Sequence, residues 1–202
     1  MTRFSRCSAI VESAAVLTLS LAAIACHTFA ADQRQVIARN SEWTITAVGD
    51  LQTAGAYRAT LIRFEAVRNG APYVDGDLYE AYDDSFAAQY DSREWVAPNA
   101  LRLGRMPPPN LVTVQLLVGN ETSQTIKYLI LNTAEMFLLL ELPPRAVVTV
   151  PTRRWGDFTD ITLRGVFDSG ASFHATSDLF KDAERRIKVI VRPSEVEMKP
   201  AG

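Results

Sequence analysis

The sequence predicts an all-β protein whose main unit is an antiparallel β-sandwich, with a smaller β region before it. From Leu111 onward, seven short apolar or alternating runs fall within about 80 residues, which is the strand density of a sandwich. Turn-forming residues separate these runs. No cysteine follows residue 30, so the fold must be held by a buried core, which the roughly 170 residues after that point can supply.

The first expected element is a cleavable export signal over residues 1–30. Arg3 and Arg6 give it a basic start, and Ala14 to Ala25 form an apolar run that is too short to span a bilayer. Small residues then lead to an expected cleavage after Ala30. The predicted location is therefore periplasmic or secreted.

An alternative is that the protein is lipid-anchored in the cell envelope. The stretch Ala23-Ile24-Ala25-Cys26 is similar to a lipobox, the four-residue motif whose cysteine is acylated in bacterial lipoproteins. Ala23 stands where the motif usually has leucine. Cys26 is thus a candidate lipidation site.

Removal of the signal leaves few kinds of reactive side chain. Cys7, Cys26 and His27 all lie within it, and His174 is the one histidine that remains. This excludes thiol nucleophiles, disulfides and metal sites of several cysteines or histidines.

Charge and hydropathy exclude two further classes. The formal charge is −2, and it becomes −3 when Arg3, Arg6 and Glu12 are removed with the signal. A mildly acidic chain without a basic face is not expected to bind nucleic acid. The longest later apolar run, Met136 to Leu140, is flanked by glutamates and prolines, so we expect a buried strand there and no transmembrane segment after signal cleavage.

The N-terminal β region is expected over residues 31–105. The dipeptide Asn69-Gly70 predicts a hairpin that pairs Tyr57–Arg68 with Ala71–Tyr79. A loop is expected from Glu80 to Asn99, and prolines in residues 106–110 predict a linker. Further strands are expected at Trp43–Val48 and Leu101–Leu103.

The sandwich is expected over residues 111–193, followed by a flexible tail at 194–202. Its seven strands make it resemble an immunoglobulin-like sandwich, although the cysteine pair of antibody domains is missing. The resemblance is architectural and implies no antibody-type function. The expected strands are Leu111–Val118, Thr125–Leu131, Met136–Leu142, Ala146–Val150, Phe158–Phe167, Ser172–Thr176 and Arg186–Val191.

One segment concentrates the chemistry of the chain. Tyr73 to Trp95 holds seven acidic residues against one base, with aromatic rings between them. Rings beside carboxylates suit a sugar- or peptide-binding surface, for which the candidate residues are Tyr79, Tyr82, Asp83, Asp84 and Trp95.

Two other interpretations of this segment stay open. Asp75 and Asp77, together with Asp83 and Asp84, could supply oxygen ligands to calcium, although their spacing is not that of a known calcium loop. No other cofactor is expected. Alternatively, the rings pack into the core and the acids face solvent in a long loop.

Catalysis has less support. Glu42 or Glu65 could pair with Glu80 as the acid and base of a glycosidase. Strand alternation places His174 on the face opposite Phe173 and Ala175, as a half-exposed residue rather than a general base. Of the tryptophans, Trp43 and Trp95 are predicted to be core anchors and Trp155 a turn residue. Separately, Asn120-Glu121-Thr122 matches a glycosylation sequon at a predicted turn.

The sequence therefore favours a non-catalytic binding or assembly module that meets a protein partner at the envelope or cell surface. The alternative is a carbohydrate-binding or carbohydrate-active protein that uses segment 73–95 and would bind a glycan. A protein interface predicts an exposed aromatic patch without a pocket. A sugar enzyme predicts a cleft with two facing carboxylates.

Overall fold

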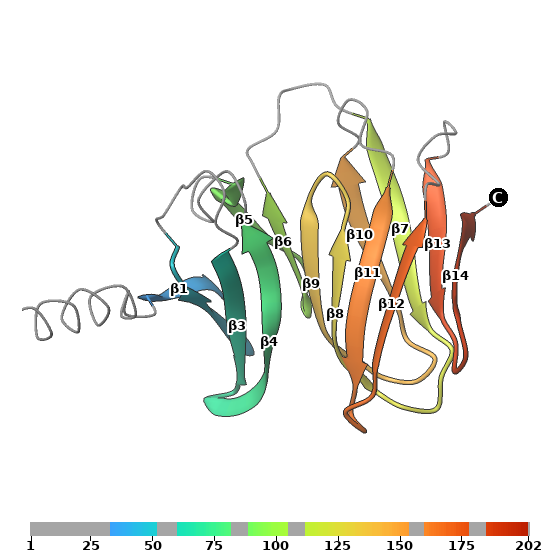
Figure 1. The fold of residues 1–202 in the computed structure, drawn as a ribbon. Coiled ribbons are helices and arrows are strands. Elements are labelled where there is room, and N and C mark those ends of the chain that lie inside the picture. Colours follow the sequence, from blue (N-terminus) through green and yellow to red (C-terminus); the bar gives the residue numbers. More distant parts are fainter. Residues whose placement is uncertain are drawn as a thin grey trace, which may run out of the picture.

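The computed structural model describes residues 33–51, 60–81, 89–104, 112–153, 160–177 and 185–201. Their regular elements are strands, which assemble into three sheets (Figure 1). The predicted all-β class is confirmed, and most strand pairs are antiparallel, as a β-sandwich requires. None of the described residues forms a helix that is long and apolar enough to cross a membrane.

The N-terminal sheet is an antiparallel meander in the order β1-β2-β3-β4. The β3–β4 hairpin turns at Asn69 and Gly70, whose φ angles of 49° and 83° are the left-handed values that Asn-Gly turns adopt. The predicted hairpin is confirmed. The strands are β1 (Gln33–Arg39), β2 (Trp43–Gly49), β3 (Thr60–Arg68) and β4 (Ala71–Ala81).

The central sheet has six strands in the order β12-β11-β8-β9-β6-β5, all antiparallel. β6 precedes the proline segment 106–110 and β9 follows it, yet the two pair directly. The division of the chain at that segment stays a prediction. The strands are β5 (Ser92–Ala97), β6 (Ala100–Gly104), β8 (Ile126–Asn132), β9 (Met136–Leu142), β11 (Ile161–Phe167) and β12 (Ser172–Ser177).

The outer sheet has the order β10-β7-β13-β14. β7 and β13 run parallel, whereas β10 and β14 pair antiparallel with their neighbours. The strands are β7 (Thr113–Asn120), β10 (Val147–Arg153), β13 (Arg186–Val191) and β14 (Val196–Pro200).

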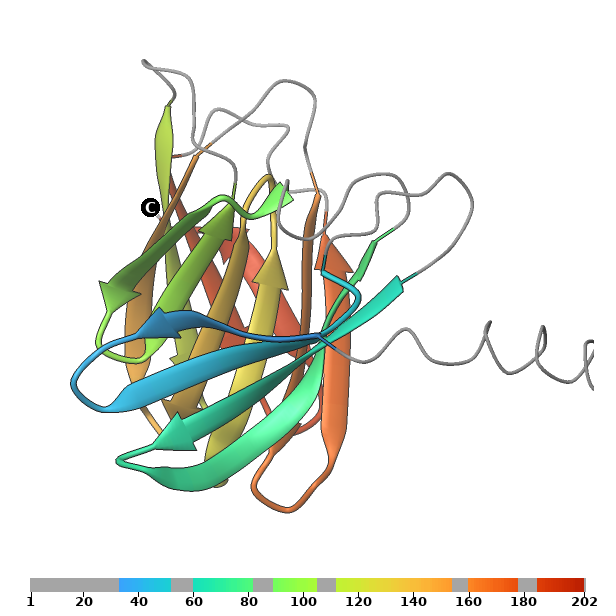
Figure 2. The same cartoon turned by 90° about the vertical axis from the view of Figure 1, so that its left-hand side faces the viewer.

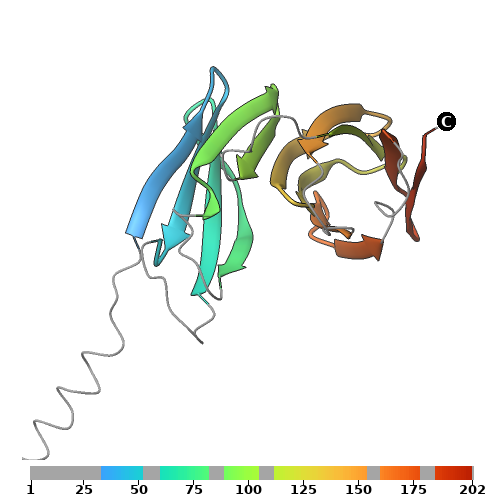
Figure 3. The same ribbon diagram turned by 90° about the horizontal axis from the view of Figure 1, so that it is seen from above.

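The three sheets form layers, with the central sheet in the middle (Figures 1 and 3). Strand β9 shows the consequence for the sequence. Leu138 and Leu140 pack toward the N-terminal sheet, while Phe137 and Leu139 pack toward the outer sheet. All four are at most 1% exposed. A strand with a core on each face has no polar side, so the predicted buried strand is confirmed.

The N-terminal sheet approaches the central sheet closely at Gly76. A Cβ atom at this position would lie 2.7 Å from the Tyr128 hydroxyl, so only glycine fits without a shift. Beside it, the Arg164 guanidinium donates hydrogen bonds of 2.9 Å to the carbonyls of Asp77 and Leu78. These contacts tie β4 to strands β8 and β11. Figure 2 shows the N-terminal sheet in front of the central sheet, with its strands crossing those behind it.

Three strands were not expected from the sequence. The loop predicted from Glu80 to Asn99 contains β5 as well as the end of β4, and the tail predicted at 194–202 contains β14, which pairs with β13. β1 was also missed. All three lie at sheet edges and bury few side chains, so their sequences show little apolar periodicity.

Some predictions lie outside the described residues. These are the export signal at 1–30 with Cys26, the linker at 106–110 and the turn at Trp155.

Candidate functional site

The predicted binding residues are distributed over two strands and the segment between them. Trp95 lies in β5 and is half-buried. Tyr79 lies in β4, where only its backbone is described. Tyr82, Asp83 and Asp84 lie outside the described residues.

The two weak calcium candidates lie on β4. Asp75 and Asp77 flank Gly76 and therefore point to the same face, which is exposed. The Asp75 carboxylate forms an ion pair of 2.6 Å with Arg63. Within the described ranges, no group of three or more acidic, histidine or cysteine side chains could hold a metal ion. Calcium binding stays a prediction.

A hollow of about 400 Å³ lies beside Trp95, which is the candidate site. One wall is the turn between β1 and β2, with Asn40, Ser41 and Glu42. The other is the end of β5 and the turn after it, residues 95–98. The site therefore combines an aromatic ring and a carboxylate from segments that are some 50 residues apart in the chain.

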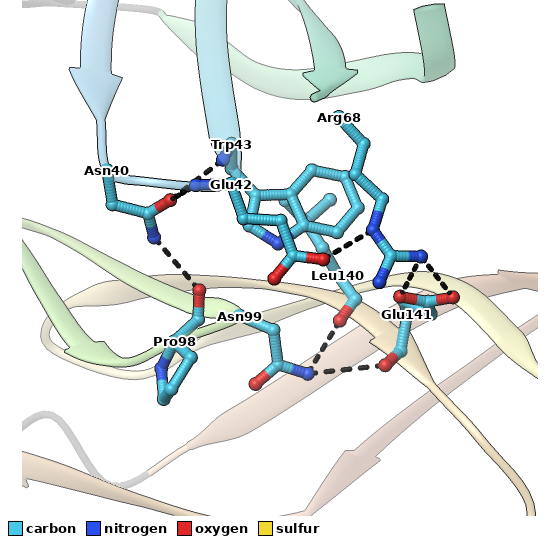
Figure 4. A network of polar contacts seen from close by, with 8 residues as sticks. All are labelled: Asn40, Glu42, Trp43, Arg68, Pro98, Asn99, Leu140 and Glu141. Atoms are coloured by element: carbon cyan, nitrogen blue, oxygen red, sulfur yellow. Dashed lines mark hydrogen bonds and ion pairs between the residues drawn. The ribbon is translucent and has the colours of Figure 1, made fainter. Parts of the chain in front are cut away.

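The Asn40 side chain builds the first wall and joins it to the second. Its carbonyl oxygen accepts hydrogen bonds from the backbone N–H groups of Glu42 and Trp43, at 2.9 and 2.7 Å. Its amide nitrogen donates to the Pro98 carbonyl at 2.9 Å (Figure 4). One side-chain amide thus pairs with the backbone N–H groups of the tight turn and also fixes the distance between the two walls of the hollow.

The Asn99 side chain anchors the second wall to β9. Its side-chain amide donates to the backbone carbonyls of Leu140 and Glu141, at 2.7 and 3.2 Å (Figure 4). The backbone N–H of Leu140 donates in return to the backbone carbonyl of Asn99 at 2.8 Å. Glu141 has a φ of 46°, a left-handed conformation that is uncommon for glutamate. The turn after β5 is therefore held by hydrogen bonds to the backbone of β9, a strand that packs against a core on each face.

Behind the hollow, Arg68 bridges two carboxylates from different sheets. Its guanidinium donates to the Glu42 carboxylate of the first wall and to the Glu141 carboxylate of β9. The ion pair between Arg68 and Glu141 has a length of 2.6 Å. It also lies 5.4 Å from the centre of the Trp43 ring, a cation–π distance. The hydrogen bond to Glu42 raises the pKa of Arg68 above its usual value. Figure 4 shows Arg68 between the two carboxylates.

The aromatic rings at this place are mostly buried. Trp43 is 1% exposed and meets the Tyr73 ring edge-on, with centroids 5.0 Å apart, which confirms Trp43 as a core anchor. Burial is the main cause that raises the pKa of Tyr73, and Glu141 adds to it. Trp95 packs against the same core, and its indole N–H is buried with no partner in the part of the chain that the structure describes.

Comparisons with family models, with curated proteins and with solved structures found no match. The function therefore has to be argued from the geometry of the site.

The glycosidase pair and His174 can be placed in part. Glu42 is bound by Arg68 and Glu65 by Arg34, while the Glu80 side chain is not described, so the pairing with Glu80 stays a prediction. His174 is exposed on β12. Phe173 and Ala175 lie on the other face of the strand and pack against the core, as expected.

Sequence reasoning assigned Asn120 a different role from the one it has. It was read as a possible glycosylation site at a turn, but it is fully buried. Its amide nitrogen donates to the Gln124 and Leu142 carbonyls at 2.8 Å, and its oxygen accepts from Thr122. The nitrogen that would carry a glycan lies inside the folded protein.

The walls of the hollow were also missed. Asn40 and Asn99 carried no signal beyond that of ordinary turn residues, and Glu42 was considered only as a catalytic carboxylate. Which turns meet depends on pairing between distant strands, and a single sequence does not show that pairing.

Proposed function

We propose that the protein is exported and acts as a non-catalytic binding or assembly module in the periplasm or at the cell surface, where it contacts a protein partner. The observation that carries this proposal is the hollow beside Trp95. Its walls are fixed by the hydrogen bonds of Asn40 and Asn99. This hollow differs from the exposed aromatic patch without a pocket that we expected of a protein interface. A preformed hollow with an apolar ring and a few polar groups nevertheless suits insertion of a partner's side chain.

The state of the nearby carboxylates supports a non-catalytic role. Glu42 and Glu141 both contact Arg68, which lies between them. They therefore form a structural ion-pair bridge between sheets instead of facing each other across a cleft. A glycosidase needs one of its two carboxyl groups free to protonate the leaving group.

Selection of random peptides displayed on phage tests the proposal. Protein purified after expression of the full chain is the target, and peptides are compared on wild type and on Ser41→Arg, which places a long side chain in the hollow from an exposed position. We expect peptides whose binding falls about tenfold or more on Ser41→Arg and on Trp95→Ala.

His174→Ala is the control, because it removes an exposed ring from a strand at the opposite edge of the central sheet. It should leave peptide binding unchanged. Peptides that bind equally to wild type and Ser41→Arg would show that the hollow is not the interface.

A carbohydrate-binding function is the second candidate, because Trp95 and Glu42 line the same hollow. A ring and a carboxylate together can stack on and hydrogen-bond a sugar. Calorimetric titration with oligosaccharides separates the two functions. Sugar binding that is lost in Ser41→Arg, in the absence of selected peptides, would replace the protein partner with a glycan.

Export and processing are part of the proposal and have their own test. The mass of the purified protein should correspond to loss of residues 1–30. A mass that includes an acylated Cys26 would indicate the lipid-anchored alternative instead.

The immunoglobulin-like description also stays a proposal. Its support is that the seven strands from β7 to β13 divide into three in the outer sheet and four in the central sheet, packed around one core.

A further inference from the structure

The outer sheet carries a second hollow, of about 460 Å³, on the face that points away from the rest of the protein. Strand register explains why it exists. Val147 of β10 and Ile190 of β13 both pair with Gly119 of β7, so the three residues form one row across the sheet. Glycine has no side chain, and the row is therefore hollow in its middle.

Several side chains around this hollow are apolar although they face outward. The inward residues of the same strands, such as Val118 and Val189, fill the core. Val147, Leu117 and Ile190 are on the opposite face, where alternation leads one to expect polar residues. Val147 is 62% exposed, the highest value among the large apolar residues that the structure describes as exposed. Leu117 and Ile190 are half-buried. Outward-facing apolar groups gathered around a hollow indicate a binding site.

The charged side chains that are available to a ligand at the rim of the hollow are positive. Arg145 and Lys188 line the hollow, both are exposed, and neither forms an ion pair with another described residue. Glu121, the one lining carboxylate, is bound by Arg192 at 3.1 Å. The backbone of Arg145 is held in place, because its N–H donates to the backbone carbonyl of Asn120 at 2.7 Å.

We propose that this hollow binds a free, single-chain anionic amphiphile, with its apolar chain on Leu117, Val147 and Ile190 and its anionic group at one of the two rim cations, Arg145 or Lys188. The apolar surface excludes small hydrophilic anions as the best ligands, and the unpaired cations disfavour a cationic head group. The volume lies in the range of small-molecule sites, about 300 to 1,000 Å³. The site is separate from the hollow beside Trp95 and does not depend on the function proposed for it.

Calorimetric titration with dodecanoate, below the concentration at which it forms micelles, tests the proposal on protein made from the full chain. We expect saturable binding of one molecule. Val147→Glu should weaken it about tenfold or more, since it replaces apolar surface with a like charge. Gly119→Leu should do the same by filling the hollow, because a Cβ at this position meets its nearest neighbour, Val147, at an ordinary 3.7 Å.

Val112→Glu is the matched control. Val112 is also an exposed valine, at 54%, but it lies before the start of β7, whereas the hollow is at the end of that strand. It should leave dodecanoate binding unchanged, and thermal melts of both glutamate variants should match wild type. Dodecyltrimethylammonium, which has the same chain and a cationic head, should bind at least about tenfold more weakly.

Three results would overturn the proposal. The first is that dodecanoate does not bind, or binds equally to wild type and Val147→Glu. The second is equal binding of the cationic amphiphile. The third is binding to vesicles of anionic phospholipid without binding of the monomer, which would identify a membrane surface as the ligand. Ser41→Arg should not affect this titration, so failure here leaves the function proposed for the other hollow standing.

Discussion

Single asparagine side chains hold the chain reversals around the candidate site. Asn40 joins the two walls of the hollow, and Asn99 anchors the second wall to the Leu140 and Glu141 carbonyls of β9. Asn120 binds the next carbonyl of that strand, at Leu142. Asn120 differs in being fully buried, with its amide donating to two carbonyls and accepting from Thr122. A buried amide with all its partners in place is costly to remove, because the partners lose their hydrogen bonds.

We therefore expect Asn120→Ala to lower the free energy of unfolding by about 2 to 3 kcal/mol, since several buried polar groups would be left unpaired. Asn132→Ala is the control, because Asn132 is half-buried and its side chain makes no hydrogen bond with the described residues. Urea unfolding curves of the two variants measure the difference. Equal stabilities would show that water replaces the lost bonds at Asn120.

At the level of the strands, the sequence predicts buried ones better than edge ones. Met136–Leu142 was expected as a strand, and β9 has those bounds. β5 was missed because Ser92–Ala97 mixes charged and apolar residues without a period of two. Edge strands owe their position to backbone pairing with a neighbour, and a side-chain pattern carries little information about that pairing.

The double-sided burial of β9 predicts that both of its faces matter equally. Leu138→Ala opens a cavity toward the N-terminal sheet and Leu139→Ala opens one toward the outer sheet. Each should lower the free energy of unfolding by about 2 to 5 kcal/mol, the range for a buried leucine. Leu61→Ala is the control, because Leu61 is 50% exposed.

Denaturant unfolding measures all three leucine variants. A small effect of Leu138→Ala together with a large effect of Leu139→Ala would mean that the N-terminal sheet is not firmly packed on β9. That result would also support the predicted division of the chain into two units.

For the whole molecule, the layered arrangement could not be read from the sequence. The sequence predicts most strands of the N-terminal and central sheets, but it does not show which sheets face each other. For the same reason Trp95 was recognised as a candidate and Glu42, its neighbour in the hollow, was not placed beside it. Contacts between layers depend on loop lengths and sheet twist, and neither leaves a local pattern.

The contact between layers also predicts how stability responds to alkaline pH. Burial raises the pKa of Tyr73 and of Tyr128 above the ordinary 10.0. The folded protein then keeps these protons at a pH where the unfolded chain has lost them. Their stabilising contribution is complete below about pH 10 and is lost as the pH rises through the folded pKa.

Tyr128→Phe should accordingly reduce the loss of unfolding free energy between about pH 9 and about pH 11, while wild type loses more. Urea unfolding at each pH measures this loss, and absorbance of the phenolate reports the titration directly. The same loss in wild type and in Tyr128→Phe would mean that other groups govern the alkaline transition.

The burial of β9 on both faces has a cost before folding is complete. A run of five apolar residues, Met136 to Leu140, is the kind of segment through which unfolded chains stick to one another. Glu135, Glu141 and the prolines at 143 and 144 border it, and charges and prolines at such borders oppose intermolecular pairing. The ion-paired Glu141 thus serves the chain twice, by discouraging aggregation while β9 is exposed and by linking two sheets once it is buried.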